Sequence, residues 1–346
     1  MSWQAMLGAA PLVEQRNGVE YFEVPCRSLL NRVRGSELPF ERTINPYLNC
    51  EVGCGYCYAR DFTEKRQGPA APDAFERRIY AKRDAPAVLR AELARLRRAG
   101  ELERPIALGT ATDPYQPIER RRRLTRALLE VLAREQGLRL SITTKSDLVL
   151  RDLDLLRTIA ERGHLRVNLT VTSVDRDLAQ SLEPRAPIPS KRLRAVEVLA
   201  RAGIVAGVFC MPILPDITCE PRALRRLVCA AKQSGAAFLA ARVLTLRPGV
   251  RPAFFAWLRG ARPGLVRRYE RMYAQGANPP LWVRERIEQV MLTLRAQYRL
   301  PEDAPFPEPE ASGARQLELF AEPAAAPERG PRPRSGPRRL PMSGAA

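Results

Sequence analysis

The sequence predicts an α/β protein in which a parallel sheet, open or closed into a barrel, is covered by helices. Two patterns support this fold class. Between about residues 41 and 245, short apolar runs alternate repeatedly with amphipathic stretches of ten to fifteen residues, which is the βαβ pattern. The apolar runs lack a clear polar face, as expected of strands that are buried on both sides.

Six apolar runs are interpreted as strands, at residues 42–45, 104–110, 138–144, 165–173, 204–212 and 236–244. Five helical patterns lie between them, at residues 86–100, 124–137, 150–163, 190–203 and 220–235. The first two end on glycine, which commonly stops a helix, and Ser190 is suited to cap the fourth. Strand and helix therefore alternate through the whole middle of the chain.

The pattern changes on both sides of this core. We expect an N-terminal extension over residues 1–40, the core barrel over 41–245 and a helical extension over 246–300. Residues 301–346 hold ten of the 31 prolines and many alanines without apolar periodicity, so they are expected to be a disordered tail.

Cysteine usage and apolar segments indicate the compartment. The chain has seven cysteines, an odd number, and three of them fall within eight positions, which argues against structural disulfides and for a reducing environment. No apolar run is long enough for a membrane helix, and the N-terminus lacks the features of a secretory signal. A cytoplasmic protein without membrane contact is expected.

The net charge of +19 allows two interpretations, a solvated basic surface or a face that binds a polyanion. Only five of the 57 basic residues are lysines, and the arginines are spread along the chain, which indicates a compositional bias. The single histidine, His164, argues against a His-rich zinc site or a Ser/His/Asp triad. A nucleic-acid-binding protein with a structural iron–sulfur or zinc site therefore stays open as an alternative to an enzyme.

The segment INPYLNCEVGCGYCYAR places Cys50, Cys54 and Cys57 on one short loop with the spacing C-x3-C-x2-C. Thiolates select zinc, copper(I) or iron–sulfur clusters, and a structural zinc site needs four protein ligands. A four-iron cubane held by three cysteines leaves one iron open to a substrate or cofactor. The alternative is a zinc knuckle completed by Cys26 or by a remote cysteine.

The cysteine loop resembles the cluster motif of radical S-adenosylmethionine (SAM) enzymes, including an aromatic residue, Tyr56, directly before the third cysteine. The resemblance extends from about Glu23 to Trp257. In order, it is carried by EVPCRSLLNR, PFERTINPY, GTATDPYQPIE, TKSDLVLRDLDLL, LEPRAP and GVFCMPILP. These stretches are similar to a bacterial group of uncharacterised radical SAM proteins related to spore photoproduct lyase. The fold implied by the resemblance is a partial (β/α)6 barrel of the TIM type, which agrees with the six strands.

The resemblance implies a [4Fe–4S] cluster on Cys50, Cys54 and Cys57 whose open iron binds SAM. Reductive cleavage of SAM would give a 5′-deoxyadenosyl radical that abstracts hydrogen from a substrate. Such an enzyme needs an electron donor such as flavodoxin or ferredoxin, and a nucleic acid is one candidate substrate. No catalytic residue is assigned beyond the cofactor sites.

Polar residues that follow the strands are candidates for SAM contacts, because sites in such barrels collect at the carboxyl ends of strands. The resemblance places Thr112, Lys145 and Ser173 at positions that contact SAM, and Tyr56 and Tyr58 at the two tyrosines that flank the cluster. Asp113 joins these candidate cofactor-binding residues because it closes the second strand. Threonine and serine at strand ends also cap the next helix, Asp113 before a proline can start a turn, and Lys145 can be a solvated charge.

Other residues keep structural alternatives. The run Arg120 to Arg123 is interpreted as an exposed helix face, with a polyanion clamp as the alternative. Glu183 and Arg192 receive no role beyond an expected salt bridge. Spore photoproduct lyase has a hydrogen-donating cysteine where this chain has Thr110, so thymine-dimer repair is not expected. Cys26, Cys210, Cys219 and Cys229 receive no role.

Overall fold

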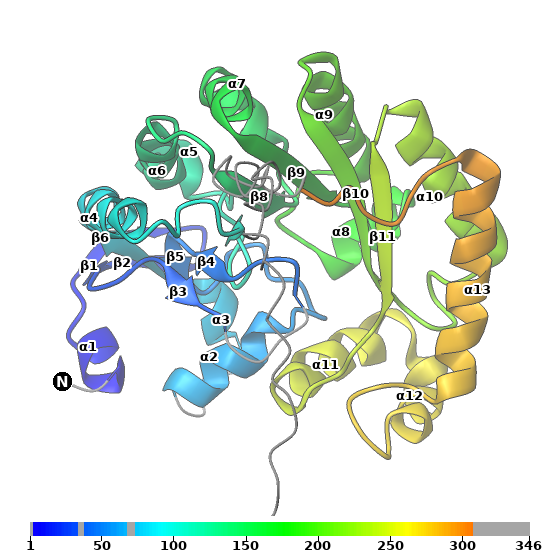
Figure 1. The fold of residues 1–346 in the computed structure, drawn as a ribbon. Helices are drawn as coiled ribbons and strands as arrows, with labels where there is room; N and C mark the ends of the chain where they lie inside the picture. The colour runs from blue at the N-terminus through cyan, green and yellow to red at the C-terminus, as the bar shows by residue number, and fades with distance from the viewer. Residues whose placement is uncertain (1–2, 34–37, 68–72, 307–346) are drawn as a thin grey trace, which may run out of the picture. The chain divides into compact units, whose positions relative to one another are not determined.

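Seven strands form the main sheet of the protein, in the order β11-β10-β9-β8-β7-β4-β3 (Figure 1). The computed structural model describes residues 3–33, 38–67 and 73–306. The strands from β4 to β11 are parallel, and only β3 runs antiparallel, at one edge. Their bounds are β3 Asn31–Arg32, β4 Arg42–Ile44, β7 Ile106–Leu108, β8 Arg139–Thr144, β9 His164–Thr170, β10 Val205–Ile213 and β11 Phe238–Val243. The six predicted strands and their parallel arrangement are confirmed.

Helices cover the outer face of this sheet (Figure 1). The predicted ones are α4 Ala85–Arg98, α6 Leu124–Leu132, α7 Leu153–Arg162, α9 Pro189–Arg201 and α10 Pro221–Gln233. Short helices that the sequence pattern did not reveal are α5 Glu119–Arg122, α8 Arg176–Leu182 and the 3-10 turn η1 Asp147–Asp152. Fully buried leucine, isoleucine and valine side chains of strands and helices form the core between these layers. Burial of this apolar surface is the main stabilising contribution to the barrel.

The other face of the sheet is more polar than the sequence analysis expected. On β8 and β9, Leu140, Ile142 and Val167 enter the outer core, so the alternate positions face inward. Among these inward positions, Asn168 donates to Ser141 Oγ at 2.9 Å and to Thr143 Oγ1 at 3.0 Å. The strands are buried on both faces, and hydrogen bonds between strands pair some of the buried polar groups of the inner face. The Oδ1 of Asn168 is buried without a hydrogen-bond partner among the described residues.

A second sheet, in the order β1-β2-β6-β5, was not predicted. It contains β1 Leu12–Arg16, β2 Val19–Pro25, β5 Tyr47–Leu48 and β6 Arg78–Arg83, and the helices around it are α1 Trp3–Gly8, α2 Ala59–Gln67 and α3 Ala74–Arg77. Strand β2 pairs in parallel with β6, far along the chain. Half of the residues of β6, RIYAKR, are basic, and the strand that it pairs with, β2, is remote in the sequence. The local hydrophobic pattern therefore does not indicate a strand.

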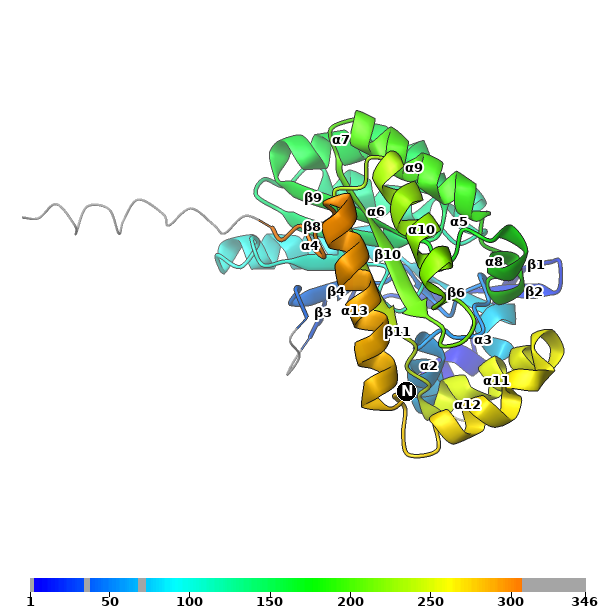
Figure 2. The same cartoon turned by 90° about the vertical axis from the view of Figure 1, so that its right-hand side faces the viewer.

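The C-terminal helices are α11 Arg251–Ala261, α12 Val266–Met272 and α13 Leu281–Tyr298, with the 3-10 turns η2 Pro248–Val250 and η3 Pro263–Leu265. Helix α13 lies alongside β11 and α10 (Figure 2). Helices α11 and α12 contribute Phe254, Leu258 and Tyr269 to one apolar cluster with Cys50 and Cys54 of the cysteine loop. The helical extension therefore packs directly on the candidate site.

Residues 301–306 belong to the segment expected to be a disordered tail, yet they lie against the sheet. The amide of Leu239 donates to the carbonyl of Pro301 at 2.9 Å, and Arg166 pairs with Asp303 at 2.8 Å. The rest of the predicted tail is outside the described residues. In the part of the chain that is described, no helix has the length and apolar character needed to cross a bilayer.

Candidate iron–sulfur and SAM site

The cysteine loop lies between β5 and α2, beside the first parallel strand. Local turns shape it: the amide of Gly53 donates to the carbonyl of Cys50 at 3.4 Å, and that of Cys57 to Cys54 at 3.3 Å. Gly53 has a φ of +70°, a left-handed conformation that favours glycine. A Cβ at Gly55 would lie 3.6 Å from Cβ of Trp257, so α11 closes over the loop at van der Waals distance.

The three thiols of Cys50, Cys54 and Cys57 are free and largely withdrawn from solvent, with Cys50 7% and Cys54 5% exposed. Burial raises the pKa of all three, that of Cys50 to about 12, and the neighbouring thiols add to the rise for Cys50 and Cys54. Without a cation the loop therefore holds neutral thiols. A bound metal centre would supply the positive charge that thiolates need.

The chemistry of the three thiols fits an iron–sulfur cluster. They are close enough to affect one another's pKa. In a cubane each cysteine binds a different iron, so the sulfurs need not converge on one point. Three soft donors on a buried loop thus fit an iron–sulfur cluster.

The remaining cysteines have other surroundings. Cys26 donates to the carbonyl of Ser28 at 3.7 Å, and Cys219 Sγ accepts from the amide of Asp216 at 3.0 Å. Cys210 is buried among the outer core residues, and burial raises the pKa of its thiol to about 12. Cys229 lies half-buried on α10. The zinc knuckle completed by Cys26 finds no support in these contacts.

Hydrogen bonds attach the loop after β7 to the cysteine loop. The amide of Asp113 donates to Cys50 Sγ at 3.4 Å, and the Thr112 hydroxyl donates to the carbonyl of Asn49 at 2.6 Å. The side chain of Gln116, which is fully buried, accepts from the amide of Glu51 at 2.7 Å and donates to Thr112 Oγ1 at 3.0 Å. Thr112 and Gln116 thereby fix the backbone on both sides of Cys50.

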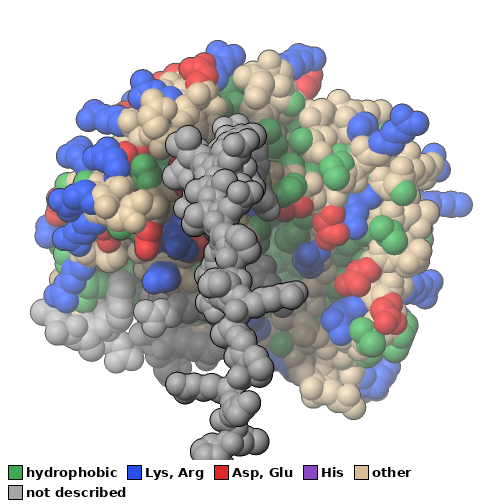
Figure 3. Space-filling model, viewed as in Figure 1, with side chains coloured by type: hydrophobic (Ala, Val, Ile, Leu, Met, Phe, Trp, Pro, Cys, Tyr) green, Lys and Arg blue, Asp and Glu red, His purple; other side chains and the backbone are tan. Residues whose placement is uncertain are grey.

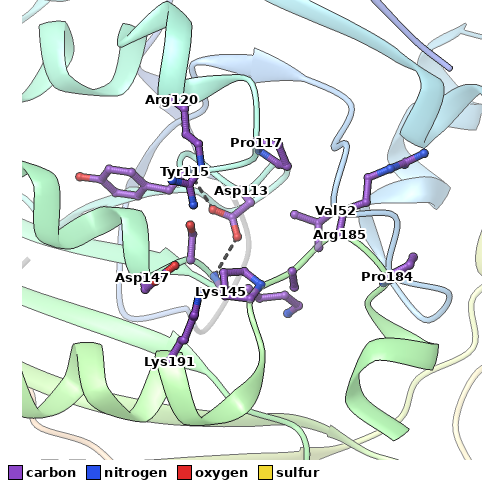
Figure 4. Close-up of a pocket in the computed structure, with 13 residues that line it drawn as sticks. Val52, Asp113, Tyr115, Pro117, Arg120, Lys145, Asp147, Pro184, Arg185 and Lys191 are labelled. Carbon is purple, nitrogen blue, oxygen red and sulfur yellow. Dashed lines mark hydrogen bonds between the residues drawn. The ribbon is translucent and has the colours of Figure 1, made fainter. Parts of the chain in front are cut away.

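Asp113 also joins this loop to the end of β8. Its carboxylate accepts from the Thr144 hydroxyl at 2.6 Å, from the Lys145 amide at 2.8 Å and from the Tyr115 amide at 2.9 Å. Figure 4 shows the bonds to Tyr115 and Lys145. The turn role that was one interpretation of Asp113 is therefore present, and it brings Lys145 next to the cysteine loop.

The buried carboxylate of Glu183 contacts the cysteine loop at Tyr56. It accepts a hydrogen bond from the Tyr56 hydroxyl and forms an ion pair with Arg192, and its Oε1 lies 3.8 Å from Nζ of Lys145. Glu183 is inaccessible to solvent and Arg192 is 1% exposed. The salt bridge expected between Glu183 and Arg192 is present in the structure. The contacts of Glu183 to Tyr56 and Lys145 were not predicted.

These charges determine one another's ionisation. Burial alone would raise the pKa of Glu183, but Arg192 and Lys145 outweigh it and the pKa is lowered. Burial alone would lower the pKa of Lys145, but Glu183 and Cys54 outweigh it and the pKa is raised. The carboxylate and the ammonium are therefore both charged at neutral pH, and Nζ lies 5.6 Å from the centre of the Tyr56 ring.

The backbone ties this region to the loop as well. The amide of Gly55 donates to the carbonyl of Leu182 at 3.2 Å, and Arg185 Nη1 donates to the carbonyl of Glu51 at 3.0 Å. The LEPRAP segment therefore also supports the cysteine loop. A sequence signal for this existed, because LEPRAP was among the stretches that carried the resemblance.

The other predicted SAM contacts lie around this centre. Tyr58 is 47% exposed, and its hydroxyl donates to the carbonyl of Thr110. Ser173 is half-buried before α8, where its hydroxyl accepts from the amide of Asp175 at 3.0 Å, as a residue before a helix often does. Thr110 Oγ1 accepts from Asn45 Nδ2 at 3.2 Å.

A pocket of about 280 Å³ opens between the cysteine loop, the loop after β7, the loop after β8 and the α8–α9 loop (Figure 4). Of the six predicted SAM contacts, only Asp113 and Lys145 line it. Tyr56 joins Lys145 through Glu183, whereas Tyr58, Thr112 and Ser173 are not part of the pocket wall. The six residues are thus brought to one end of the barrel but not into one enclosed pocket.

Comparison with known proteins agrees with this geometry. Residues 44–228 match the family model described as the Radical SAM superfamily. An uncharacterized protein of Mycobacterium tuberculosis is 35% identical over 301 residues, 87% of each chain. Another, from Methanocaldococcus jannaschii, is 33% identical over 174 residues, 50% of this chain and 61% of the relative.

Among solved structures, spore photoproduct lyase with bound AdoMet and dinucleoside spore photoproduct superimposes with a TM-score of 0.61. It is 17% identical over 80% of this chain and 79% of that one. A second structure of the lyase, complexed with dinucleoside spore photoproduct, gives the same TM-score and the same coverage. This likeness confirms the expected TIM-like barrel with a helical C-terminal region.

Proposed function

Because this chain belongs to the radical SAM superfamily and is a radical SAM enzyme, we propose that Cys50, Cys54 and Cys57 hold its [4Fe–4S] cluster. The single observation that carries this proposal is a set of three free thiols on one loop, two of them buried and that of Cys57 half-buried, with neither a disulfide nor a fourth cysteine among the described contacts of the loop. When bound, the cluster and SAM supply the reductive cleavage and hydrogen abstraction typical of the superfamily.

The chain's own residues hold and shield this centre. We assign SAM contacts to Tyr56, Tyr58, Thr112, Asp113, Lys145 and Ser173. The ammonium of Lys145 can donate to a carboxylate or ribose oxygen, and the negative charge of Glu183 keeps it protonated. Thr112 and Asp113 also fix the loop, so their replacement would disturb both the cysteines and SAM.

Water exclusion is a second task of the chain. Phe254 and Leu258 of α11 are fully buried against the cysteine loop, and Tyr56 is 6% exposed. A dry environment strengthens the electrostatic contacts of bound groups and protects reactive species from side reactions. The helical extension is therefore part of the proposed active site and not an independent module.

The first experiment is anaerobic purification with iron and sulfide analysis, followed by SAM cleavage with dithionite. We expect about four irons per chain from the cubane assignment, and release of 5′-deoxyadenosine that is lost in Cys54→Ala. The matched control is Cys229→Ala, which alters a cysteine on α10 and should keep the iron. Zinc without iron, or equal release from the Cys54→Ala variant, would contradict the assignment.

A nucleic acid is the substrate class that we propose to test first. The net charge of +19 favours polyanion binding, although in Figure 3 basic and acidic side chains are interspersed over the visible face. Thr110 has no thiol to donate hydrogen, so we do not propose thymine-dimer repair. Deuterium transfer from a labelled polynucleotide into 5′-deoxyadenosine would support this substrate class. Salt-sensitive binding without any transfer would favour a binding protein with a structural cluster.

A further inference from the structure

Two aromatic side chains next to the cysteine loop are exposed to solvent. Tyr58, directly after Cys57, is 47% exposed, and Phe62, one turn farther along in α2, is 39% exposed. Their rings meet edge to face, with 5.9 Å between the ring centres. The guanidinium carbon of Arg247, from the loop after β11, lies 5.7 Å from the centre of the Phe62 ring. Tyr58, Phe62 and Arg247 are called the aromatic patch below.

The aromatic patch lies between the two edges of the open barrel. Among the described strands, β4 pairs with β3 and β7 and β11 pairs with β10, so the sheet does not close between β4 and β11 (Figure 1). The segments that follow these strands meet, because the amide of Gly249 donates to Oδ1 of Asp61 in α2 at 3.3 Å. The Tyr58 hydroxyl donates to the carbonyl of Thr110, just after β7. The patch is therefore at the carboxyl ends of the strands, on the side of the cysteine loop.

The core of the fold does not account for these two rings. Neither Tyr58 nor Phe62 belongs to the apolar clusters formed by the described residues. Single exposed apolar residues are common on protein surfaces. Two rings that contact each other beside a cation form a larger surface, and such a surface is typical of a binding site.

The aromatic patch is also distinct from the pocket of about 280 Å³. Neither Phe62 nor Arg247 lines that pocket, and Tyr58 is outside its wall. Tyr58 is the one residue that the patch shares with the proposed SAM contacts. Because Tyr58 is covalently next to Cys57, a group stacked on the patch would lie beside the proposed cluster.

The chemistry of the patch fits a flat ring with a negative charge next to it. Aromatic side chains stack on planar rings, and an arginine guanidinium both stacks on rings and binds phosphate through parallel hydrogen bonds. An unpaired nucleotide supplies the ring and the phosphate in one residue. In a duplex the faces of the bases are covered by stacking, and in an acidic peptide the rings and the charges belong to different residues. The pattern therefore favours a single strand.

We propose that Tyr58, Phe62 and Arg247 bind an unpaired nucleotide of a single-stranded nucleic acid, with the base on the rings and the phosphate on Arg247. This inference rests on the proposed function, because it specifies the form in which a nucleic-acid substrate meets the barrel. The stacked nucleotide is a neighbour of the reacting one and makes no contact with the pocket. Stacking on aromatic side chains is a general mode of binding single strands with little sequence preference.

The test measures fluorescence anisotropy of short labelled strands with the anaerobically purified holoenzyme. The probes are a single strand in DNA and in RNA form, its duplex, and a single strand that lacks the bases. Phe62→Leu removes the ring, Phe62→Tyr restores one, and Arg247→Gln removes the charge. The matched controls are Trp282→Leu, an exposed ring on α13, and Arg259→Gln, an exposed arginine of α11. Iron content and dithionite-driven SAM cleavage are measured for every variant.

We expect Phe62→Leu to bind the single strand about tenfold more weakly, as for the loss of one base–aromatic stack. This loss should be absent with the duplex and with the strand that lacks bases, and Phe62→Tyr should bind like the wild type. Arg247→Gln should weaken binding at low salt and reduce the salt slope by about one. Both controls should keep the wild-type affinity. All variants should keep the iron and the SAM cleavage measured without nucleic acid.

Several results would overturn the proposal. One is an unchanged affinity of Phe62→Leu for the single strand, and another is an equal loss with the strand that lacks bases. Weaker SAM cleavage by Phe62→Leu would show that the patch serves the cofactor. Displacement of the single strand by an equal concentration of an acidic, tyrosine-containing peptide would show that it serves a peptide. Absence of iron or of SAM cleavage in the wild type would instead refute the proposed function, whereas strand binding judges the patch in either case.

Discussion

Glu183 and Arg192 form an ion pair that is almost completely inaccessible to solvent and that contacts the cysteine loop through Tyr56. Arg192 is held further by its bonds to the carbonyls of Pro187 at 2.7 Å and Thr170 at 3.1 Å. The other oxygen of Glu183 accepts from Tyr56 and from the Thr172 hydroxyl, the latter at 3.2 Å. One carboxylate thus connects the loop that carries the cysteines to the ends of β8 and β9.

The first prediction concerns the stability contributed by this carboxylate. Glu183→Gln should lower the free energy of unfolding by about 3–5 kcal/mol, because it leaves the buried Arg192 and the largely buried Lys145 without their anion. Urea denaturation of the metal-free protein measures the change. Glu197→Gln removes an ion-pairing carboxylate on the surface of α9 and should leave the midpoint nearly unchanged. Equal midpoint shifts in the two variants would count against the role of Glu183.

The second prediction is the pH dependence of that difference. The pKa of Glu183 is lowered in the folded protein, so its contribution is complete above its unfolded value of 4.5 and is lost as pH falls through the lower folded value. The difference in unfolding free energy between the wild type and Glu183→Gln should therefore be constant near neutrality and shrink only below pH 4.5. Unfolding curves at a series of acidic pH values check this. A difference that is independent of pH would contradict the assigned ionisation.

The third prediction separates SAM binding from cluster binding. Lys145→Met should weaken SAM binding by about 10- to 100-fold, the range expected for loss of a charged hydrogen bond, and keep the iron content. Isothermal titration of the anaerobic holoenzyme with SAM measures the affinity, and iron analysis tests the cluster. Lys232→Met, on α10, is the matched control and should bind SAM normally. If the Lys145→Met variant loses iron as well as SAM affinity, Lys145 supports the cysteine loop instead of contacting SAM.

The fourth prediction concerns the turn that leads into the site. Gly109 has a φ of +92°, and a Cβ there would lie 2.5 Å from the carbonyl oxygen of Thr143 and 2.6 Å from Pro114. Gly109→Ala should therefore destabilise the protein by about 1–3 kcal/mol or more. Gly260→Ala, in helix α11 with open space around it, should be neutral or stabilise by up to ~1 kcal/mol. Thermal unfolding of the two variants compares them, and a tolerated Gly109→Ala would contradict the described turn.

The fifth prediction concerns residues 301–306. Arg166 is 4% exposed, and its guanidinium pairs with Asp303 and donates to the carbonyl of Ala304 at 3.2 Å. Asp303→Ala should lower the free energy of unfolding by about 1–3 kcal/mol, since a buried charge loses its anion. Glu285→Ala, an exposed carboxylate on α13, provides the comparison. If both variants unfold at the wild-type urea concentration, this segment does not stabilise the barrel.

Much of the fold followed from local patterns. The six parallel strands and their covering helices were predictable because apolar runs and amphipathic stretches alternate with a regular length. The sheet formed by β1, β2, β5 and β6 was not, because β2 and β6 pair across a long stretch of chain and their side chains carry no clear alternation. Helix α6 ends at Leu132, earlier than its stop glycine suggested, because a turn already begins there.

For the site, the sequence by itself predicted the chemistry: three thiols at C-x3-C-x2-C spacing predict a soft metal centre wherever the loop lies, because ligand type and spacing are local properties. Only the tertiary structure decided what surrounds it. Glu183 and Arg192 lie far along the chain from Tyr56, and α11 lies farther still, so no local pattern could place them against the loop. Their positions follow from the packing of the whole barrel, in which buried charges must find partners and apolar faces must be covered.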